Sequence, residues 1–243
     1  MDIRYFKTLA STNDTAKELA VSGAKEFLTV VADEQTKGRG RMGREFVSPI
    51  GGAYFSTLLR PTQPFDRWGL FTPFAAYAVR RALLDLTGVA PDIKWVNDLL
   101  VEGKKICGIL AESSLDKKGG GFLILGFGIN IGNQNLPAAL SETAGCLPYH
   151  DRDALIRRVL FYLCDYRRQM QSMHWLDEYR SACAFLGKRV EVIEKHRRRF
   201  GIALDITETG ALSVCFEDDE RAELQGGEIS LRGAQADTFR HNL

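Results

Sequence analysis

The chain has 243 residues, enough for one large domain or two unequal ones with a real apolar core. Apolar residues make up 45% and charged residues 26%, which excludes disorder as a description of the whole chain. Lysine plus arginine number 32 and aspartate plus glutamate 31, and the resulting net charge of +1 argues against a dedicated nucleic-acid or membrane-surface binder.

Five cysteines are spread along the chain, none of them in a C-x-x-C pair, and the four histidines are equally scattered. This usage indicates a reducing compartment rather than a disulfide scaffold or a zinc site. The first residues contain no apolar secretory core, and no apolar run approaches the roughly 18 residues of a membrane span. We therefore expect a cytoplasmic protein with no membrane partner.

Predicted strands and helices alternate up to about residue 186. Ser11-Thr12-Asn13-Asp14 offers side chains that cap helices, so we expect a helix to begin just after them. Asn97-Asp98 interrupts one apolar strand, and Gly103-Lys104 predicts a hairpin turn after it. The expected elements are, in chain order, a strand over 3–9, a helix over 15–21, strands over 27–32 and 53–59, a helix over 71–86, strands over 93–101, 106–112 and 122–131, and helices over 151–173 and 175–185.

The pattern of predicted elements changes after Leu186-Gly187, where the predicted helices end. Five short strand-like segments follow, separated by turns such as Glu208-Thr209-Gly210, a pattern typical of a small β-barrel or sandwich. We predict two domains, residues 1–186 and residues 187–243. The five segments are 190–193, 201–206, 212–216, 222–224 and 229–231.

A glycine- and arginine-rich segment, Lys37-Gly38-Arg39-Gly40-Arg41-Met42-Gly43-Arg44, places four cations in eight residues with no acid among them. Its glycines match G-x-G-x-x-G, but a dinucleotide-binding loop opens a helix, and residues 46–52 that follow cannot form one. Glycine lets backbone N–H groups approach an anion, and arginine adds a two-pronged donor for phosphate or carboxylate. The segment therefore favours a loop that covers an anionic ligand; the alternative is a mobile basic surface loop.

Lys94 lies on the apolar strand that Asn97-Asp98 interrupts. Lysines are rarely buried unless they are paired, so a lysine in this position needs an anionic partner. That partner is either Asp98 or the carboxylate or phosphate of a ligand, and the segment alone does not decide between them.

Gly126-Phe127-Gly128-Ile129-Asn130 ends another apolar strand. The glycines permit another group to approach the backbone closely. Asn130 is a candidate to hydrogen-bond a nucleotide or to orient a Mg²⁺-bound water. The simpler alternative is a bulge followed by an asparagine turn.

Together these segments resemble the biotin–protein ligases, also called biotin–[acetyl-CoA-carboxylase] ligases, over nearly the whole chain. The resemblance implies an α+β fold of the biotin–lipoate ligase type, similar to class II aminoacyl-tRNA synthetases. Such a fold has a mixed, largely antiparallel sheet flanked by helices and a C-terminal SH3-like β-barrel. The matching segments, in the order of the family, are Ser11-Thr12-Asn13, Asp33-Glu34-Gln35, Gly38 to Arg44, Ser48-Pro49, Lys94 to Asp98, Lys105 to Glu112 and Gly126 to Asn130.

The resemblance implies two half-reactions. Biotin and ATP, which carries Mg²⁺, form biotinyl-5′-AMP and pyrophosphate, and a lysine of a biotin carboxyl carrier protein then attacks the acyl phosphate and releases AMP. Cations offset the repulsion between carboxylate and triphosphate, so neither a protein nucleophile nor a protein metal ligand is expected. The implied catalytic residues are Lys94, Arg39 and Arg44. The implied biotin-binding residues are Ser11, Thr12, Asn13, Gln35, Arg39, Gly40, Arg41, Lys94 and Gly108, and those for ATP or the adenylate are Arg41, Arg44, Lys94, Asn97 and Asn130.

Two positions depart from the family pattern. Val96 stands where the family usually has proline, and Phe46 stands where tryptophan is common. The chain has no room for a DNA-binding domain before its first strand, so no nucleic-acid partner is expected. The family includes monomers and homodimers, and the sequence does not choose between them. A second basic run, Lys195-His196-Arg197-Arg198-Arg199, is expected to be a solvated loop rather than a dock for the carrier or for ATP.

Two other functions remain open. Lipoate or octanoate ligases share the fold and the adenylate chemistry, although the Gly-Arg-Gly-Arg loop favours biotin. A nucleic-acid-binding module that uses residues 37–44 and 195–199 predicts strongly salt-dependent binding to DNA or RNA. The near-zero net charge and the lack of stacking aromatic residues weigh against that module.

Overall fold

The computed structural model describes residues 1–117, 119–132, 136–194, 197–225 and 228–230. Its larger part is built on a seven-stranded sheet in the order β1-β2-β3-β7-β6-β5-β4, in which β1 and β2 pair in parallel and all other neighbours are antiparallel. This mixed, largely antiparallel sheet confirms the predicted fold class. The strands are β1 (Ile3–Leu9), β2 (Thr29–Gln35), β3 (Ala53–Leu59), β4 (Asp92–Lys94), β5 (Asp98–Val101), β6 (Lys104–Leu115) and β7 (Gly121–Ile129).

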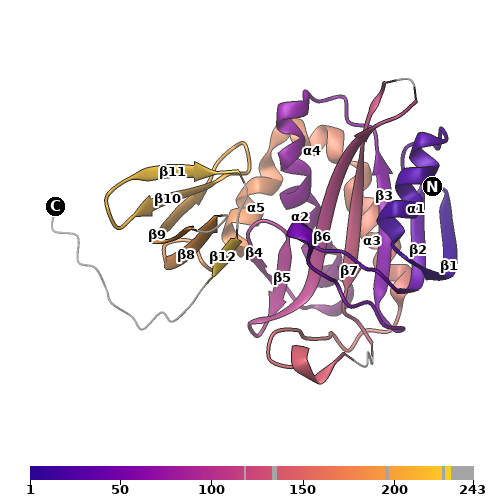
Figure 1. Cartoon of the computed structure of the whole chain (residues 1–243), viewed down its shortest axis with the longest axis horizontal. Coiled ribbons are helices and arrows are strands. Elements are labelled where there is room, and N and C mark those ends of the chain that lie inside the picture. Colours follow the sequence, from indigo (N-terminus) through magenta and orange to yellow (C-terminus); the bar gives the residue numbers. More distant parts are fainter. Residues whose placement is uncertain (118, 133–135, 195–196, 226–227, 231–243) are drawn as a thin grey trace.

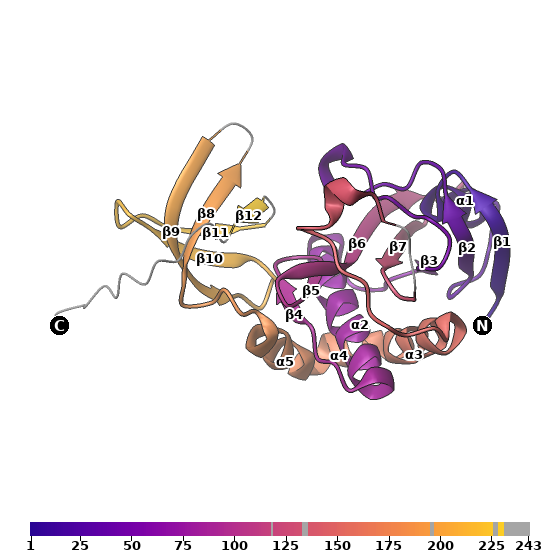
Figure 2. The ribbon, with the colours of Figure 1, turned by 90° about the horizontal axis from the view of Figure 1, so that it is seen from below.

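Helices cover the sheet on both faces, with α1 on one face and α2 to α5 on the other (Figures 1 and 2). None of the described helices is long and apolar enough to cross a membrane. The α-helices are α1 (Thr12–Val21), α2 (Phe71–Thr87), α3 (Arg152–Cys164), α4 (Tyr166–Ser172) and α5 (His174–Ala182), and three 3₁₀ turns cover η1 (Arg41–Gly43), η2 (Phe65–Leu70) and η3 (Ala138–Leu140).

The alternation of side chains along β3 and β7 divides the apolar core into two clusters. Phe55 and Phe127 point toward α2 and stack on each other with ring centroids 4.6 Å apart. Leu58, Phe122 and Ile124 point the other way and pack under α1. The larger cluster anchors the sheet on α2 and α3, and the smaller one fixes the position of the short helix α1.

On the face of the sheet that α1 covers, the end of β7 carries glycines instead of large side chains. Gly126 and Gly128 occupy this face of β7, Gly128 pairs with Gly108 of β6, and Gly126 pairs with Ser56 of β3. Helix α1 has only 10 residues; its first turn lies over Gly126 and the rest of it covers Phe122 and Ile124. The part of the sheet beyond α1 therefore forms the floor of a depression.

The predicted single helix over 151–173 was wrong, because the chain forms α3 and α4 with a break at Asp165. Asp165 has φ −89° and ψ 9°, and its carboxylate accepts hydrogen bonds from the side chains of Arg168 and Gln169. Aspartate commonly favours such local contacts over an uninterrupted helix. The other predicted helices are present with shifted ends.

The C-terminal part forms a separate antiparallel sheet in the order β11-β10-β9-β8-β12. This confirms the five strands predicted after Leu186. Within the described residues β11 and β12 do not pair with each other, so the sheet is open rather than a closed barrel. Its strands are β8 (Arg189–Glu194), β9 (Arg197–Ile206), β10 (Leu212–Phe216), β11 (Arg221–Leu224) and β12 (Glu228–Ser230).

The C-terminal sheet lies beside β4 and α5 (Figure 1). The indole Nε1 of Trp95, which is 3% exposed, donates a hydrogen bond of 3.0 Å to the carbonyl of Gly210 in the turn between β9 and β10. On the other side of Trp95, the hydroxyl of Tyr179 in α5 donates to the carbonyl of Val96 at 3.1 Å. The segment that follows β4 is therefore held by both α5 and the C-terminal sheet.

Replacing Trp95 by phenylalanine should lower the free energy of unfolding by about 1–3 kcal/mol, because the buried Gly210 carbonyl loses its donor. The measurement is urea unfolding followed by circular dichroism. Trp68→Phe is the matched control, since the Trp68 indole donates to Gln63, only five residues away, and is partly exposed. Equal losses in the two variants would contradict a special role for the Trp95–Gly210 contact.

Candidate active site

A cavity lies on the α1 face of the sheet, above the glycines of β6 and β7. It is bounded by the loop that follows β2, the start of α1 and the segment after β4. It holds about 150 Å³ of space that water can enter and is partly open to solvent. Every residue predicted for the site lines it except Asn130, so the folded chain brings together segments that are far apart in sequence. The predicted residues in its wall are Ser11, Thr12, Asn13, Gln35, Arg39, Gly40, Arg41, Arg44, Lys94, Asn97 and Gly108.

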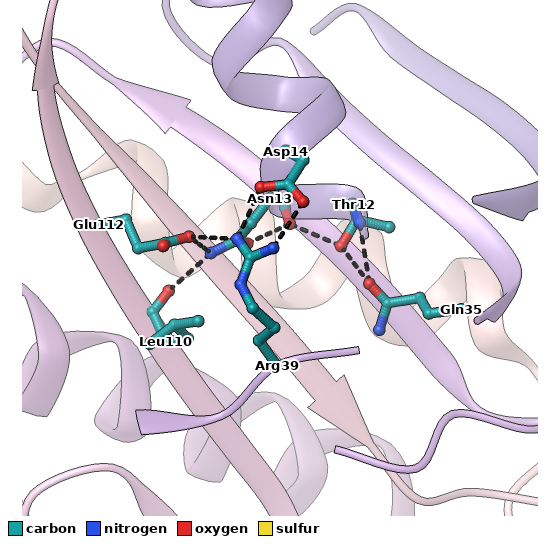
Figure 3. Close-up of polar contacts among 8 residues, drawn as sticks. Thr12, Asn13, Asp14, Gln35, Arg39, Leu110 and Glu112 are labelled. Atoms are coloured by element: carbon teal, nitrogen blue, oxygen red, sulfur yellow. Dashed lines mark hydrogen bonds and ion pairs between the residues drawn. The ribbon is translucent and has the colours of Figure 1, made fainter. Parts of the chain in front are cut away.

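The first turn of α1 contributes polar side chains to the cavity wall rather than caps to the helix. The helix begins at Thr12, and Ser11 at its N-cap is extended and makes no side-chain capping bond. Gln35 Oε1 accepts hydrogen bonds from the Thr12 amide at 2.8 Å and the Thr12 hydroxyl at 3.0 Å, and its Nε2 donates to Ser48 Oγ at 2.9 Å (Figure 3). The expected capping role of residues 11–14 was therefore wrong, since these contacts aim the side chains at β2 and β3.

Ser56 of β3 is a buried polar residue that sequence reasoning missed. Its hydroxyl contacts Thr12 Oγ1 at 2.7 Å and Asn13 Oδ1 at 2.6 Å. The signal was available in principle, because a serine fully buried in an apolar strand needs a hydrogen-bond partner. Ser56 fixes the two α1 side chains that reach the cavity.

The glycines of the cavity floor leave room for specific side chains. A methyl group at Gly126 would overlap Asn13 Oδ1, and one at Gly128 would overlap the ring of Phe46. At Gly108 it would lie 3.1 Å from the Phe46 ring and 3.0 Å from Lys105 Nζ. The predicted close approach to Gly108 is thus made by protein side chains in this structure, and Phe46, at a departure from the family pattern, lies over both strands.

Lys94 ends β4 at the cavity wall, half-buried. Asp98, which was one of its two expected partners, instead forms an ion pair of 2.7 Å with Lys105. Throughout the described part of the chain, no hydrogen bond or ion pair involves the Lys94 ammonium group. The remaining expected partner is the anion of a ligand.

Asn97 connects the segment after β4 to both the loop and the sheet. Its Oδ1 accepts a hydrogen bond from Arg41 Nη1 at 3.1 Å, and its Nδ2 donates to the carbonyl of Ile109 at 2.9 Å. The peptide bond between Trp95 and Val96, where the family usually has proline, is cis. The Arg41–Asn97 contact places one side of the loop against the wall that carries Lys94.

Arg39 is paired with two carboxylates that sequence reasoning did not assign. Its two terminal nitrogens bond the carboxylate of Asp14 at 2.5 and 2.6 Å, and one of them lies 3.5 Å from Glu112 Oε2 (Figure 3). Hydrogen bonding to Arg39 lowers the pKa of Asp14, and the Asp14 hydrogen bond raises the pKa of Arg39. Both groups are therefore ionised at neutral pH.

Asn130 lies outside the cavity. Its side chain is 4% exposed, and its Nδ2 donates to the carbonyl of Gly145 at 3.0 Å. Its Oδ1 is buried and has no hydrogen-bond partner in the described residues. The amide thus joins the end of β7 to the segment around residue 145, and its nucleotide-binding role stays a prediction.

Comparison with known proteins gives two family matches that cover the two sheets. Residues 5–130 match the Biotin/lipoate A/B protein ligase family, and residues 185–232 match the Biotin protein ligase C terminal domain. The chain belongs to the biotin/lipoate A/B protein ligase family. This confirms the resemblance inferred from the sequence motifs.

Individual relatives agree with this assignment. The chain is 38% identical over 179 residues to the bifunctional ligase/repressor BirA of Bacillus subtilis, covering 70% of this chain but only 54%, about half, of that relative. It is 29% identical over 233 residues to a biotin–[acetyl-CoA-carboxylase] ligase of Mycobacterium tuberculosis, covering 87% of this chain and 83% of that protein.

A solved structure is also similar. The biotin protein ligase of Aquifex aeolicus in complex with biotin and ATP superposes with a TM-score of 0.79 at 27% identity, covering 94% of this chain and 97% of the other. The similarity includes the C-terminal sheet, which the second family match covers as well. Both parts of the fold are therefore typical of the family.

The second basic run lies at the hairpin between β8 and β9. Lys195 and His196 lie outside the described residues. Arg198 pairs with Glu191 at 3.1 Å, and Arg199 pairs with Asp218 and Glu220 at 3.1 and 2.7 Å. Arg198 and Arg199 are therefore neutralised by acids of the C-terminal part of the chain, which supports their expected role as ordinary surface charges.

Proposed function

We propose that the chain is an ATP-dependent biotin–protein ligase. It joins biotin to the AMP part of ATP, which gives biotinyl-5′-AMP and pyrophosphate, and then transfers the biotinyl group to a lysine of a biotin carboxyl carrier protein with release of AMP. Two relatives are named biotin–[acetyl-CoA-carboxylase] ligases, and the similar structure of the Aquifex aeolicus protein was solved with biotin and ATP.

The observation that carries the proposal is the environment of Lys94. An ammonium group at the wall of a cavity, with its nearest expected acid taken by Lys105, is prepared to pair with an incoming anion. Biotin offers a carboxylate and ATP an α-phosphate, and the first half-reaction joins these two anions. Lys94 offsets their repulsion and the charge that develops on phosphorus, an effect for which preorganised cations are suited.

The other residues of the cavity wall offer either neutral hydrogen-bonding groups or positive charge to a ligand. The hydroxyls and amides of Ser11, Thr12, Asn13 and Gln35 suit the ureido ring of biotin, which carries both donors and an acceptor. Arg44 offers a second cation, on the loop that covers the cavity. The ring thus binds at the α1 end and the carboxylate extends toward Lys94, where the adenylate forms.

Arg41, Gly40 and Asn97 complete the covering loop and its contact with the wall. The loop over the cavity limits the access of water, which protects an acyl phosphate from hydrolysis. We propose that Mg²⁺ enters with ATP as part of the substrate. Asp98 is unsuited to act as general base for the attacking lysine, because its carboxylate forms an ion pair with Lys105.

The rival substrate is lipoate or octanoate, because the first family match includes ligases for both kinds of acid. The match of residues 185–232 to the biotin protein ligase C-terminal domain favours biotin. The rival nucleic-acid module is not supported, since Arg39, Arg198 and Arg199 are all paired with carboxylates. We propose a cytoplasmic carboxylase, or its carrier domain, as the partner.

The test is ATP–pyrophosphate exchange with biotin, lipoate, octanoate or no acid. Biotin should support exchange, and the purified protein should then label an apo carrier domain but not a variant in which the acceptor lysine is replaced by arginine. Exchange with lipoate or octanoate but not biotin would refute the substrate. Exchange with biotin without carrier labelling would refute the second half-reaction.

A further inference from the structure

Arg39 is fully engaged by the protein itself. Its guanidinium binds the Asp14 carboxylate through both terminal nitrogens, the arrangement in which an arginine–carboxylate pair is strongest. The second acid, Glu112, approaches from β6 on the other side. With two carboxylates around one guanidinium, the local charge is −1, which is unsuited to receiving another anion.

Glu112 also holds Asn13, a residue of the predicted biotin-binding wall. Its Oε2 accepts a hydrogen bond of 2.6 Å from Asn13 Nδ2, and Asn13 is held from the other side by Ser56. Figure 3 shows Arg39, Asp14, Asn13 and Glu112 meeting above β6 and β7. The position of Arg39 on the loop and the position of Asn13 on α1 are thus fixed by one shared carboxylate.

The loop folds back on itself next to this cluster. The Gly40 amide donates to the carbonyl of Arg44 at 2.7 Å, and the Phe46 amide donates to the carbonyl of Gly38 at 2.9 Å. On the opposite side, Arg41 reaches Asn97. The loop over residues 38–46 is therefore a compact hairpin, attached at Arg39 to α1 and β6 and at Arg41 to the segment after β4.

We propose that Asp14 and Glu112 form a carboxylate clamp that holds Arg39, and with it the loop over residues 38–46, above the cavity before any substrate enters. Arg39 is then a positioning residue, in contrast to the anion-binding role expected from the motif. This inference rests on the proposed function for its effect on biotin, but the clamp itself concerns the protein without ligand.

The clamp should act on substrate affinity rather than on the chemical step. Ordering a flexible loop opposes binding, so a loop already held in place improves the affinity for biotin. The clamp touches neither Lys94 nor Arg44, so the turnover at saturating substrate should not change. If Arg39 instead had to leave the two acids in order to bind the ligand, removing one acid would tighten ligand binding. The reason is that this acid would no longer compete with the ligand for the guanidinium group.

Limited trypsin digestion of the protein without ligand tests the clamp directly, because the loop contains Arg41 and Arg44 as cleavage sites. Asp14→Asn should accelerate cleavage within the loop about fivefold, the value expected when an exposed ion pair is lost. The double variant Asp14→Asn with Glu112→Gln should accelerate it about tenfold or more.

In ATP–pyrophosphate exchange, Asp14→Asn should raise the KM for biotin about fivefold with an unchanged kcat. Asp14→Glu should restore both the cleavage rate and the KM.

Glu217→Gln is the matched control, because Glu217 makes a similar exposed contact with Arg189 in the C-terminal sheet, at 2.5 and 3.1 Å. It should change neither readout. Unchanged cleavage in Asp14→Asn would overturn the clamp, and faster cleavage with a lower or unchanged KM would overturn its effect on biotin. If the wild type shows no exchange with biotin at all, the proposed function fails, while the cleavage rates still test the clamp.

Discussion

Lys94→Ala should reduce biotin-dependent ATP–pyrophosphate exchange by about 100- to 1000-fold, the usual loss when one preorganised partner of a developing charge is removed. The reason is that two other cations of the cavity wall are already paired, Lys105 with Asp98 and Arg39 with Asp14. Lys94→Arg should recover only part of the activity, because a planar guanidinium directs its donors differently.

The matched control is Lys7→Ala, which removes an exposed lysine from β1 at the edge of the same sheet. It should keep wild-type exchange. Circular dichroism of Lys94→Ala should show an intact fold, since the ammonium makes no contact within the described residues that the fold requires. Full exchange activity in Lys94→Ala would remove the observation on which the proposed function depends.

Gly126→Ala should weaken biotin binding at least about tenfold and lower the free energy of unfolding by about 1–3 kcal/mol, the usual penalty of inserting a methyl group into a packed site. The added methyl group would overlap Asn13 Oδ1. Asn13 cannot move aside without breaking its hydrogen bonds to Ser56 and Glu112. Isothermal titration with biotin and urea unfolding measure the two effects.

Gly69→Ala is the control for this change. Gly69 also has an ordinary backbone conformation, and an added methyl group there would meet no atom within 4 Å. The substitution should therefore affect neither biotin binding nor stability. A Gly126→Ala variant that bound biotin as tightly as Gly69→Ala would show that Asn13 is not part of the binding wall.

Much of the site could be predicted because its residues lie in contiguous motifs. The glycine–arginine loop, the Lys94 segment and Ser11-Thr12-Asn13 all line the cavity, as expected from the resemblance. What no motif contains is the choice of partner. The sequence left Lys94 with two possible partners, Asp98 or a ligand anion. The register of β5 and β6 decides between them, because it brings Asp98 within 2.7 Å of Lys105.

The same limit explains the residues that were missed. Asp14 is recognisable from the sequence as a residue of the first helical turn, but its contact with Arg39 joins positions 25 residues apart. The contact of Asn13 with Glu112 joins positions 99 residues apart. Long-range pairs of this kind follow from the packing of α1 on the sheet. Asn130 was placed in the site by its motif, whereas the structure turns its amide toward the segment around residue 145.

The contact between Trp95 and the turn at Gly210 means that the C-terminal sheet cannot be removed as an independent module. Gly210 also lies against Leu70 and Pro73 at the start of α2. A chain truncated before β8 would expose this apolar surface and leave the indole of Trp95 without its acceptor, directly next to Lys94. Truncation of a part remote in sequence would thus disturb Lys94, the residue to which we assign the central role in the proposed adenylate formation.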